Sequence, residues 1–502
     1  MQKISVGLIT TACLLEASCI NTPKEEKKAP NIIFILSDDL SWGDLGCFGQ
    51  RKIKTPNIDR IANEGIKFTQ AYCGNAVCAP SRACLMSGLH PGHARVRDNV
   101  YKSYRESFQD GDLTVAMLLK QAGYKTGLFG KWGLSLYNQP GVPNKMGFDE
   151  FFGYLNQQQA HTFYPEFLYH NQERVYFPEN AEHYKIENYS RASPYDKDGK
   201  CMPLGIKDPS KAKYSFDVYC QKSLEFVRKN KDAPFFLYLA YTIPHGPLIV
   251  PELGEYKDKD WPVQHKERSA MITRMDKEVG NLLNLIKELR LDDNTIIFFA
   301  SDNGNGYGIN DRYLKEKSSS TLQDFFNLDS PTRGMKGDSY DGAFHVPAMV
   351  RWPGHIAPNQ VSDQIWAFWD FLPTAAEIAG VEPPSNIDGI SILPTLLGKG
   401  EQKQHEYLYW EFQQNQAIRS GKWYAHRANM KQVELYDLIS DPQQSRDLSD
   451  RFPDIVKKME EIMSKAHTPS DVCPSPGETQ KEFTKRLKDN NIPERPDNRD
   501  LY

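Results

Sequence analysis

Residues 31–39, NIIFILSDD, decide the fold, because an unbroken apolar run from Ile32 to Leu36 leads into two aspartates. Such a continuous run is typical of a parallel strand that helices cover on both faces. Similar short runs recur along the chain: YKTGLF at 124–129, FFLYLA at 235–240, TIIFFA at 295–300 and AMVRW at 348–352. The sequence therefore predicts an α/β fold with a large mixed, mainly parallel sheet sandwiched by helices.

Helical patterns and a change in composition predict how the rest of the chain is organised. Apolar residues at spacings of three and four predict helices at 57–65, 113–123 and 275–290. After about residue 385 the strands become shorter and more polar, as in YLYWEF at 407–412 and VELYDL at 433–438. We expect a main α/β domain at 30–385 and a smaller C-terminal α+β subdomain with a tail at 386–502. The tail, from about Thr468, is rich in Pro, Asp and Lys, and we expect it either to wrap the surface or to be loosely ordered.

Composition and the first residues bear on partners and location. Lys and Arg total 61 against 65 Asp and Glu, without a long run of either sign, so nothing indicates nucleic-acid binding. Residues 1–29 begin with MQKISVGLITTACLLEASC, which predicts a signal peptide and tether. Cys19 follows small residues, as the acylated cysteine of a bacterial lipoprotein does. We therefore expect export to the periplasm or the outer membrane, with a lipid anchor through Cys19.

Polar side chains follow the predicted strands where parallel strands end at one edge of a sheet. Asp38 and Asp39 follow the first strand, and Asp302 and Asn303 follow TIIFFA. Their oxygen atoms suit Ca²⁺, with Mg²⁺ the less favoured ion. Either pair alone is often a helix cap or a turn, but both pairs at neighbouring strand ends predict a metal site.

Basic side chains are expected at the same edge. Lys131 and His245 follow YKTGLF and FFLYLA, and Arg82 and Lys336 are further candidates. A lone Lys or His is most often an ordinary surface residue. A divalent cation beside these groups makes a pocket for a tetrahedral oxyanion, because their positive charges neutralise its negative charges.

Cys78 lies in NAVCAPSRACLMSG at 75–88, where proline and arginine predict the start of a helix. A thiol at the positive end of a helix is acidified. The structural alternative is a disulfide between Cys78 and Cys73 or Cys84.

Together these blocks resemble type I sulfatases of the alkaline phosphatase superfamily over most of residues 30–460. AVCAPSRACLMSG and GYKTGLFGKWGL are similar to the two family signatures, and PHGP, SDNG and RGMKGDSYDGAFHVPAMVRWPG resemble further family blocks. Four positions depart from the pattern. Ser87 stands where Thr or Ala is commoner, Gly133 stands where a histidine is often found, and Asp341 and His345 stand where Glu and Arg are common.

The resemblance implies that a maturation enzyme oxidises Cys78 to formylglycine, whose hydrate attacks the sulfate ester. Its second hydroxyl then expels sulfate and regenerates the aldehyde. By the same resemblance, Arg82 orients the hydrate and the metal ligands. Lys131, His245 and Lys336 bind the sulfate, and His245 or Lys336 protonates the leaving alcohol. Because Gly133 replaces a histidine, the group that removes the proton in the second step stays unassigned.

The segment NQQQAHTFYPEFLYHN at 156–171 resembles a block of bacterial exported carbohydrate sulfatases. His161 is the first candidate for substrate contact, followed by Trp410 and Glu411, although such residues also cover sheets in many proteins. We expect a galactose or N-acetylgalactosamine sulfate of a host glycan as substrate. Two alternatives stay open: a phosphatase or phosphodiesterase of the same superfamily, and a non-catalytic lipoprotein that binds sulfated glycans.

Overall fold

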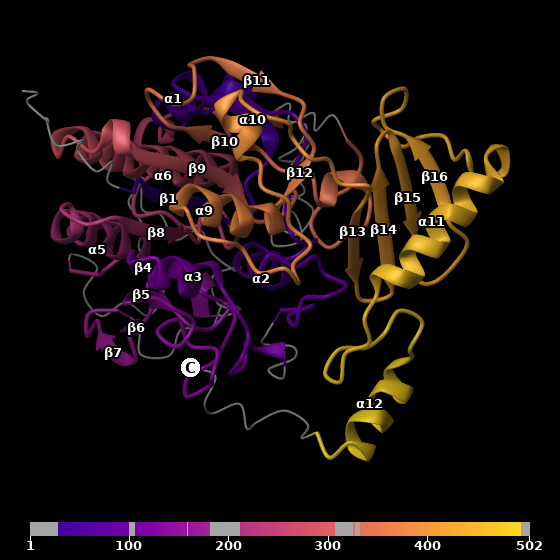
Figure 1. Ribbon diagram of the computed structural model, residues 1–502. Helices are drawn as coiled ribbons and strands as arrows, with labels where there is room; N and C mark the ends of the chain where they lie inside the picture. Colours follow the sequence, from indigo (N-terminus) through magenta and orange to yellow (C-terminus); the bar gives the residue numbers. More distant parts are fainter. Residues whose placement is uncertain are drawn as a thin grey trace, which may run out of the picture.

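The computed structural model describes residues 29–99, 106–157, 159–180, 211–306, 325–326 and 332–492 (Figure 1). The predicted signal peptide and the anchor at Cys19 lie outside these residues, as does the end of the predicted tail. Within the described ranges, no helix combines the length and apolar character needed to cross a bilayer.

A ten-stranded sheet forms the centre of the molecule, in the order β11-β2-β10-β9-β1-β8-β4-β5-β6-β7. Its strands are β1 (Asn31–Ser37), β2 (Ile66–Phe68), β4 (Lys125–Lys131), β5 (Glu150–Tyr154), β6 (Phe167–His170), β7 (Glu173–Tyr176), β8 (Phe235–Ala240), β9 (Thr295–Ser301), β10 (Ala348–Arg351) and β11 (Gln360–Ser362). The central run β9-β1-β8-β4-β5 is parallel. β10 runs antiparallel to β9, and β6 runs antiparallel to β5. The predicted mixed, mainly parallel sheet is confirmed.

Helices cover both faces of this sheet, as the alternation of buried residues along β1 shows. Ile33 and Ile35 face a core formed with α1, α5 and α6, whereas Ile32 and Phe34 face a core formed with α2, α3 and α9. The helices are α1 (Pro56–Asn63), α2 (Cys78–Ser87), α3 (Val115–Gln121), α5 (Ser215–Asn230), α6 (Val263–Glu288), α9 (Phe371–Ala379) and α10 (Leu393–Leu397). Both faces of β1 are thus apolar, which explains its unbroken hydrophobic run.

The C-terminal part is a four-stranded antiparallel sheet at the right of Figure 1. Its strands are β13 (Leu408–Phe412), β14 (Asn415–Ser420), β15 (Trp423–Arg427) and β16 (Glu434–Asp437), and a separate two-stranded sheet pairs β3 (Ala71–Tyr72) with β12 (Trp366–Ala367). α11 (Pro453–Ala466) covers one face of the four-stranded sheet through Met459 and Met463. The other face packs on the core of the main domain through Trp410 and Tyr424.

Part of the polar tail is ordered, which agrees with one of the two alternatives expected for it and not with a loose end. It contains α12 (Gln480–Asp489), which starts with a capping box between Thr479 and Glu482. Arg486 donates to the carbonyl oxygens of Ser470 and Cys473 at 2.7 and 2.8 Å. These local hydrogen bonds order a segment with few apolar residues.

Candidate active site

Two neighbouring parallel strands bring the predicted metal ligands together. β1 and β9 pair in register with Ser37 opposite Ser301, so Asp38 and Asp302 leave the sheet at the same level. The backbone N–H of Asp39 donates to Asp302 Oδ1 at 3.3 Å, and Asn303 Nδ2 donates to Asp39 Oδ1 at 2.7 Å. All four side chains are buried. The chain therefore gathers three carboxylates and one amide in a space closed to bulk water.

Two oxygen atoms of this cluster make no hydrogen bond within the described residues. Asp39 Oδ2 and Asn303 Oδ1 are buried, and neither makes a hydrogen bond to any described residue. A Cβ atom on Gly306 would lie 2.4 Å from Asp39 Oδ2, so only a glycine leaves room beside this carboxylate. Buried polar atoms are rarely left unsatisfied. A hard divalent cation with oxygen ligands fits Asp38, Asp39, Asp302 and Asn303.

Lysine and arginine side chains surround the acids. Lys131 Nζ donates to Asp38 Oδ2 at 2.6 Å, and Lys336 Nζ donates to Asp39 Oδ1 at 2.6 Å. Arg82 donates to Asp302 Oδ2 through Nη2 at 2.8 Å and through Nε at 3.1 Å. Its Nη1 also donates to the carbonyl oxygen of Lys131 at 2.9 Å, which fixes the end of β4. The three predicted cations thus lie within the acidic cluster.

Cys78 is the first residue of α2 and faces this cluster. Its Sγ donates to Asp38 Oδ1 at 3.4 Å and accepts a hydrogen bond from Lys336 Nζ at 3.2 Å. Cys73, Cys78 and Cys84 are all free thiols, so the structure contains no disulfide at Cys78. The expectation of an acidified thiol is wrong. Burial and the carboxylates of Asp302 and Asp38 raise the pKa of Cys78 to about 12, despite the neighbouring lysines.

The charges of the cluster shift the pKa values of its acids in opposite directions. Burial would raise the pKa of Asp38, but Lys131, His245 and Arg82 together hold it well below its ordinary value. Burial and the charge of Asp38 raise the pKa of Asp302 to about 6, although Arg82 opposes the shift. The acidic ligands are therefore not equivalent, and Asp38 is the one most strongly held in its charged form.

Two stacked imidazoles complete this edge of the sheet. His245 Nε2 lies 3.5 Å from Asp39 Oδ2, and the ring of His161 stacks on that of His245 with centroids 3.7 Å apart. His161 Nε2 lies 3.5 Å from Lys131 Nζ. Burial and the charge of Lys336 lower the pKa of His245 to about 4, and burial, His245 and Lys131 lower that of His161 as well. Both rings are therefore neutral at neutral pH.

Gln157 belongs to the same region and could not be singled out from its neighbours in the sequence. Its Oε1 would lie 2.4 Å from a Cβ atom on Gly133. Both polar atoms of the Gln157 amide are buried without a partner among the described residues. The amide-rich segment at 156–159 was the only sequence signal, and it did not distinguish Gln157 from Gln159.

Arg268, on α6, is a second residue that the sequence did not indicate. It is fully buried, and its Nη2 donates to the carbonyl oxygen of Asp39 at 3.1 Å and to Asp44 Oδ2 at 2.6 Å. This link holds the backbone of Asp39, whose φ of 60° is unusual for a residue other than glycine. A charged residue in a long, charge-rich helix carries no sequence signal for such a role.

Trp410 and Glu411, predicted as sugar contacts, have interior positions. Trp410 is fully buried and its Nε1 donates to the carbonyl oxygen of Cys73 at 3.1 Å. Glu411 is 5% exposed and pairs with Arg97 at 2.7 Å and with His467 at 2.8 Å. A fully buried ring has no surface to offer a sugar, and a carboxylate with such partners is already satisfied. These positions argue against the predicted substrate contact.

Comparisons with known proteins agree with this geometry. The sequence profile of the family described as Sulfatase matches residues 30–381. The profile described as N-sulphoglucosamine sulphohydrolase, C-terminal, matches residues 335–468. Together the two profiles span the main sheet and the whole C-terminal sheet.

Individual relatives are similar over most of their length. The N-acetylgalactosamine-6-sulfatase of Homo sapiens is 33% identical over 413 residues, which cover 79% of this chain and 71% of the relative. The N-acetylgalactosamine-6-O-sulfatase of Bacteroides thetaiotaomicron is 26% identical over 519 residues, covering 92% and 97%. The crystal structure of Ps i-CgsB in complex with k-i-k-neocarrahexaose superposes with a TM-score of 0.72 at 25% identity, covering 93% of this chain and 98% of the other.

Proposed function

The chain belongs to the sulfatase family and is a sulfuric ester hydrolase, and we propose that it removes the sulfate of a galactose or N-acetylgalactosamine residue in a host glycan. The relatives named above as N-acetylgalactosamine sulfatases act at position 6 by their names. We therefore place the ester of the proposed substrate at O6. The proposal includes conversion of Cys78 to formylglycine by a maturation enzyme.

One observation carries the proposal: Cys78 Sγ lies between an acidic cluster and a cationic one. It is 3.4 Å from Asp38 Oδ1 and 3.2 Å from Lys336 Nζ. A nucleophile made from this side chain has carboxylates on one side, which suit a cation, and ammonium groups on the other, which suit an anion. A sulfate ester needs both, because its oxygens are negative while its sulfur is attacked.

The proposed roles follow from these contacts. Ca²⁺ held by Asp38, Asp39, Asp302 and Asn303 would supply Lewis acidity at this position, with Mg²⁺ as the less favoured ion. Lys131 and Lys336 each carry three N–H donors, so each keeps a donor for a sulfate oxygen after its protein contacts. Arg82 keeps Asp302 in place through two hydrogen bonds.

Proton transfer is assigned to the lysine and imidazole groups. We assign the proton for the leaving sugar oxygen to Lys336, because burial would lower its pKa but the charge of Asp39 holds it well above its ordinary value. His245, the other candidate, is neutral at neutral pH. We assign proton removal in the second step to His161, in place of the histidine absent at Gly133. A neutral imidazole offers a lone pair, and His161 is the ring nearest to Lys131. Gln157, next to Gly133, would donate to the substrate from its unpartnered amide.

Location and partners complete the proposal. The leader at residues 1–29 and Cys19 support an exported, lipid-anchored protein of a bacterium. Export suits an enzyme whose substrate is a glycan outside the cell. Its partners would be the sulfated carbohydrate and the formylglycine-generating enzyme.

The test is sulfate release from a panel of esters by protein matured in a host with a formylglycine-generating enzyme. The panel contains galactose and N-acetylgalactosamine sulfated at position 3, 4 or 6, with the matching 6-phosphates as controls. We expect release from the 6-sulfates. Faster hydrolysis of the phosphates would favour the phosphatase alternative. Tight binding of sulfated sugars without release would favour the binding lipoprotein, and release from another position would correct the proposed ester.

A further inference from the structure

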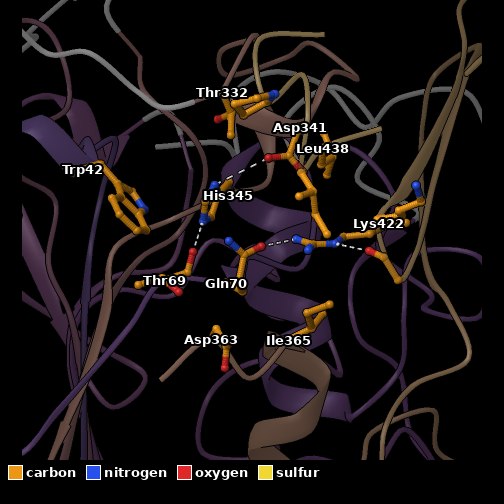
Figure 2. Close-up of a pocket in the computed structure, with 14 residues that line it drawn as sticks. Trp42, Thr69, Gln70, Thr332, Asp341, His345, Asp363, Ile365, Lys422 and Leu438 are labelled. Atoms are coloured by element: carbon orange, nitrogen blue, oxygen red, sulfur yellow. Dashed lines mark hydrogen bonds and ion pairs between the residues drawn. The ribbon is translucent and has the colours of Figure 1, made fainter. Parts of the chain in front are cut away.

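A cavity of about 690 Å³ lies between the main domain and the C-terminal sheet, apart from the cluster around Cys78 (Figure 2). Trp42, which follows β1, lines one side, and Asp341 and His345, which precede β10, line another. Arg419 and Lys422, from the hairpin of β14 and β15, line the side of the C-terminal sheet. Three separate parts of the chain therefore contribute polar side chains to one space.

One polar atom in the cavity lining lacks a partner. Asp341 Oδ2 and His345 Nδ1 form an ion pair at 3.5 Å, whereas Trp42 Nε1 is buried and makes no hydrogen bond to another described residue. The other polar atoms of Asp341 and His345 are also engaged. Tyr72 donates to Asp341 Oδ1 at 2.9 Å, and His345 Nε2 donates to the carbonyl oxygen of Thr69 at 2.9 Å. Asp341 and His345 are thus held in place, and the Trp42 N–H remains as a donor for a ligand rich in hydroxyls.

Arg419 adds a positive charge without a direct counter-ion. It is 7% exposed and donates to neutral acceptors: Gln70 Oε1 at 2.5 Å, the carbonyl oxygen of Gly421 at 3.2 Å, and the hydroxyl of Tyr72. Within the described part of the chain it forms no ion pair with a carboxylate, and its Nη2 remains free. In Figure 2, Lys422 lies on this side of the cavity and Trp42 on the opposite side. A buried guanidinium normally meets an anion.

We propose that this cavity binds an anionic sugar residue, a uronate or a second sulfated sugar, of the glycan that carries the scissile sulfate. The anionic group would lie against Arg419 and Lys422, and the ring hydroxyls would meet Asp341, His345 and Trp42. Asp363, also in the lining, offers another acceptor for a hydroxyl. The proposal rests on the proposed function, because it assumes a carbohydrate substrate. Trp42 follows β1 and His345 precedes the antiparallel strand β10, so the cavity and the catalytic cluster lie at the same edge of the sheet.

Direct binding tests this inference independently of turnover. The probes, measured by isothermal titration calorimetry, are a non-sulfated chondroitin tetrasaccharide, whose anions are uronates, a neo-carratetraose sulfate, whose anions are sulfates, and uncharged chitotetraose. We expect the protein to bind at least one anionic probe at least about tenfold more tightly than chitotetraose. The anionic probe that binds more tightly identifies the source of the anion. Equal affinity for all three probes would overturn the proposal.

Two variants test whether the anionic probe binds in this cavity. Arg419→Gln should lower the affinity for the anionic probe about tenfold. The double variant Asp341→Glu, His345→Arg should abolish binding, because its longer side chains would fill the cavity. Lys431→Ala, at an exposed lysine of the C-terminal sheet region, is the matched control and should bind as the wild type does. Circular dichroism and release of sulfate from a monosaccharide ester report that each variant is folded. Wild-type affinity in both cavity variants would refute the site.

The two proposals fail separately. If the protein binds anions through Arg419 but releases no sulfate from any ester, the proposed binding site in the cavity is supported and the proposed substrate is refuted. If it releases sulfate from a monosaccharide but the cavity variants do not reduce binding, the proposed function is supported and the binding site in the cavity is refuted.

Discussion

Two buried ionic networks in this molecule have similar compositions but different states of satisfaction. The catalytic network comprises Asp38, Asp39, Asp302, Asn303, Arg82, Lys131 and Lys336, and it leaves Asp39 Oδ2 and Asn303 Oδ1 without a hydrogen bond to a described residue. The seam network, between the main domain and the C-terminal sheet, comprises Glu411, Arg97, Tyr409 and His467. There, both carboxylate oxygens of Glu411 are used, with contacts of 2.7 to 2.8 Å, and a ring nitrogen, His467 Nε2, makes no hydrogen bond to a described residue.

The number of hydrogen bonds that a buried carboxylate already makes distinguishes a structural role from a ligand-binding one. A buried carboxylate that all its neighbours satisfy stabilises an interface and has nothing left for a ligand. A buried oxygen without a partner is costly, unless a cation or a substrate completes it. Residue type alone did not make this distinction, and Glu411 was predicted as a substrate contact for that reason. The five predictions below test or refine the comparison, starting with the largest effect.

Replacing the proposed nucleophile should have the largest effect. Cys78→Ala should lower kcat for a sugar sulfate by about 10⁴-fold or more, because no group remains to attack sulfur. Mass spectrometry of the wild-type peptide that contains Cys78 should show the aldehyde mass. Cys84→Ala is the control, as that thiol is buried in the same helix but is not in contact with the acids. Substantial turnover by Cys78→Ala would place the nucleophile elsewhere.

Removing divalent cations should have the second largest effect on activity. Chelation should lower activity by roughly 10³-fold, because the acids that hold the ion would then repel the substrate. Adding Ca²⁺ should restore activity more fully than adding Mg²⁺. Binding can be followed without activity as a rise in the unfolding temperature when the ion is added to chelated protein. Full activity after exhaustive chelation would contradict the interpretation of the unsatisfied oxygens.

Glu411→Gln should act on stability and leave the chemistry unchanged. Removing this charge leaves Arg97 buried without its partner, so the free energy of unfolding should fall by roughly 3 kcal/mol. The matched control is Glu225→Gln in the exposed pair with Lys222, where we expect a change below about 0.5 kcal/mol. Urea unfolding measures both. A large loss of kcat/KM in folded Glu411→Gln would revive the predicted substrate contact.

His161→Ala should lower kcat by about a hundredfold, in line with the loss of a group that moves a proton. His170→Ala, an exposed histidine of the same segment, is the control and should be unaffected. Burst kinetics would separate the two halves of the reaction. If His161 acts in the second half, the first turnover should stay fast while later turnovers slow. A change in KM alone would instead make His161 a substrate contact.

The stability of the seam between the main domain and the C-terminal sheet should also depend weakly on pH. Burial lowers the pKa of His90 to about 4, although Asp388 opposes the shift, whereas the unfolded value is about 6.5. The unfolded chain therefore binds the additional proton between these values, and stability is lost as pH falls through this window. The free energy of unfolding should decrease by about 1–2 kcal/mol between pH 7 and 5. His90→Gln should lack this increment, and an identical pH profile would exclude His90 as its source.

Much of the fold could be predicted from the sequence. Five apolar runs became strands of the main sheet, and the three predicted helices correspond to α1, α3 and α6. The site residues at strand ends could also be named, because parallel strands in register end at one edge. Contacts between distant loops could not be predicted. The stacking of His161 on His245 and the meeting of Gln157 with Gly133 depend on how a loop folds back over that edge.

The sequence by itself determined which elements form and which residue types stand at their ends, since hydrophobic period and local chemistry are properties of short stretches. Only the tertiary structure decided the state of each polar atom. Burial and charges brought from distant segments raised the pKa of Cys78, satisfied Glu411 and left Asp39 Oδ2 and Asn303 Oδ1 without a hydrogen bond to a described residue. The physical reason is that desolvation and electrostatic energy depend on all the groups around an atom, whereas a sequence shows only its neighbours along the chain.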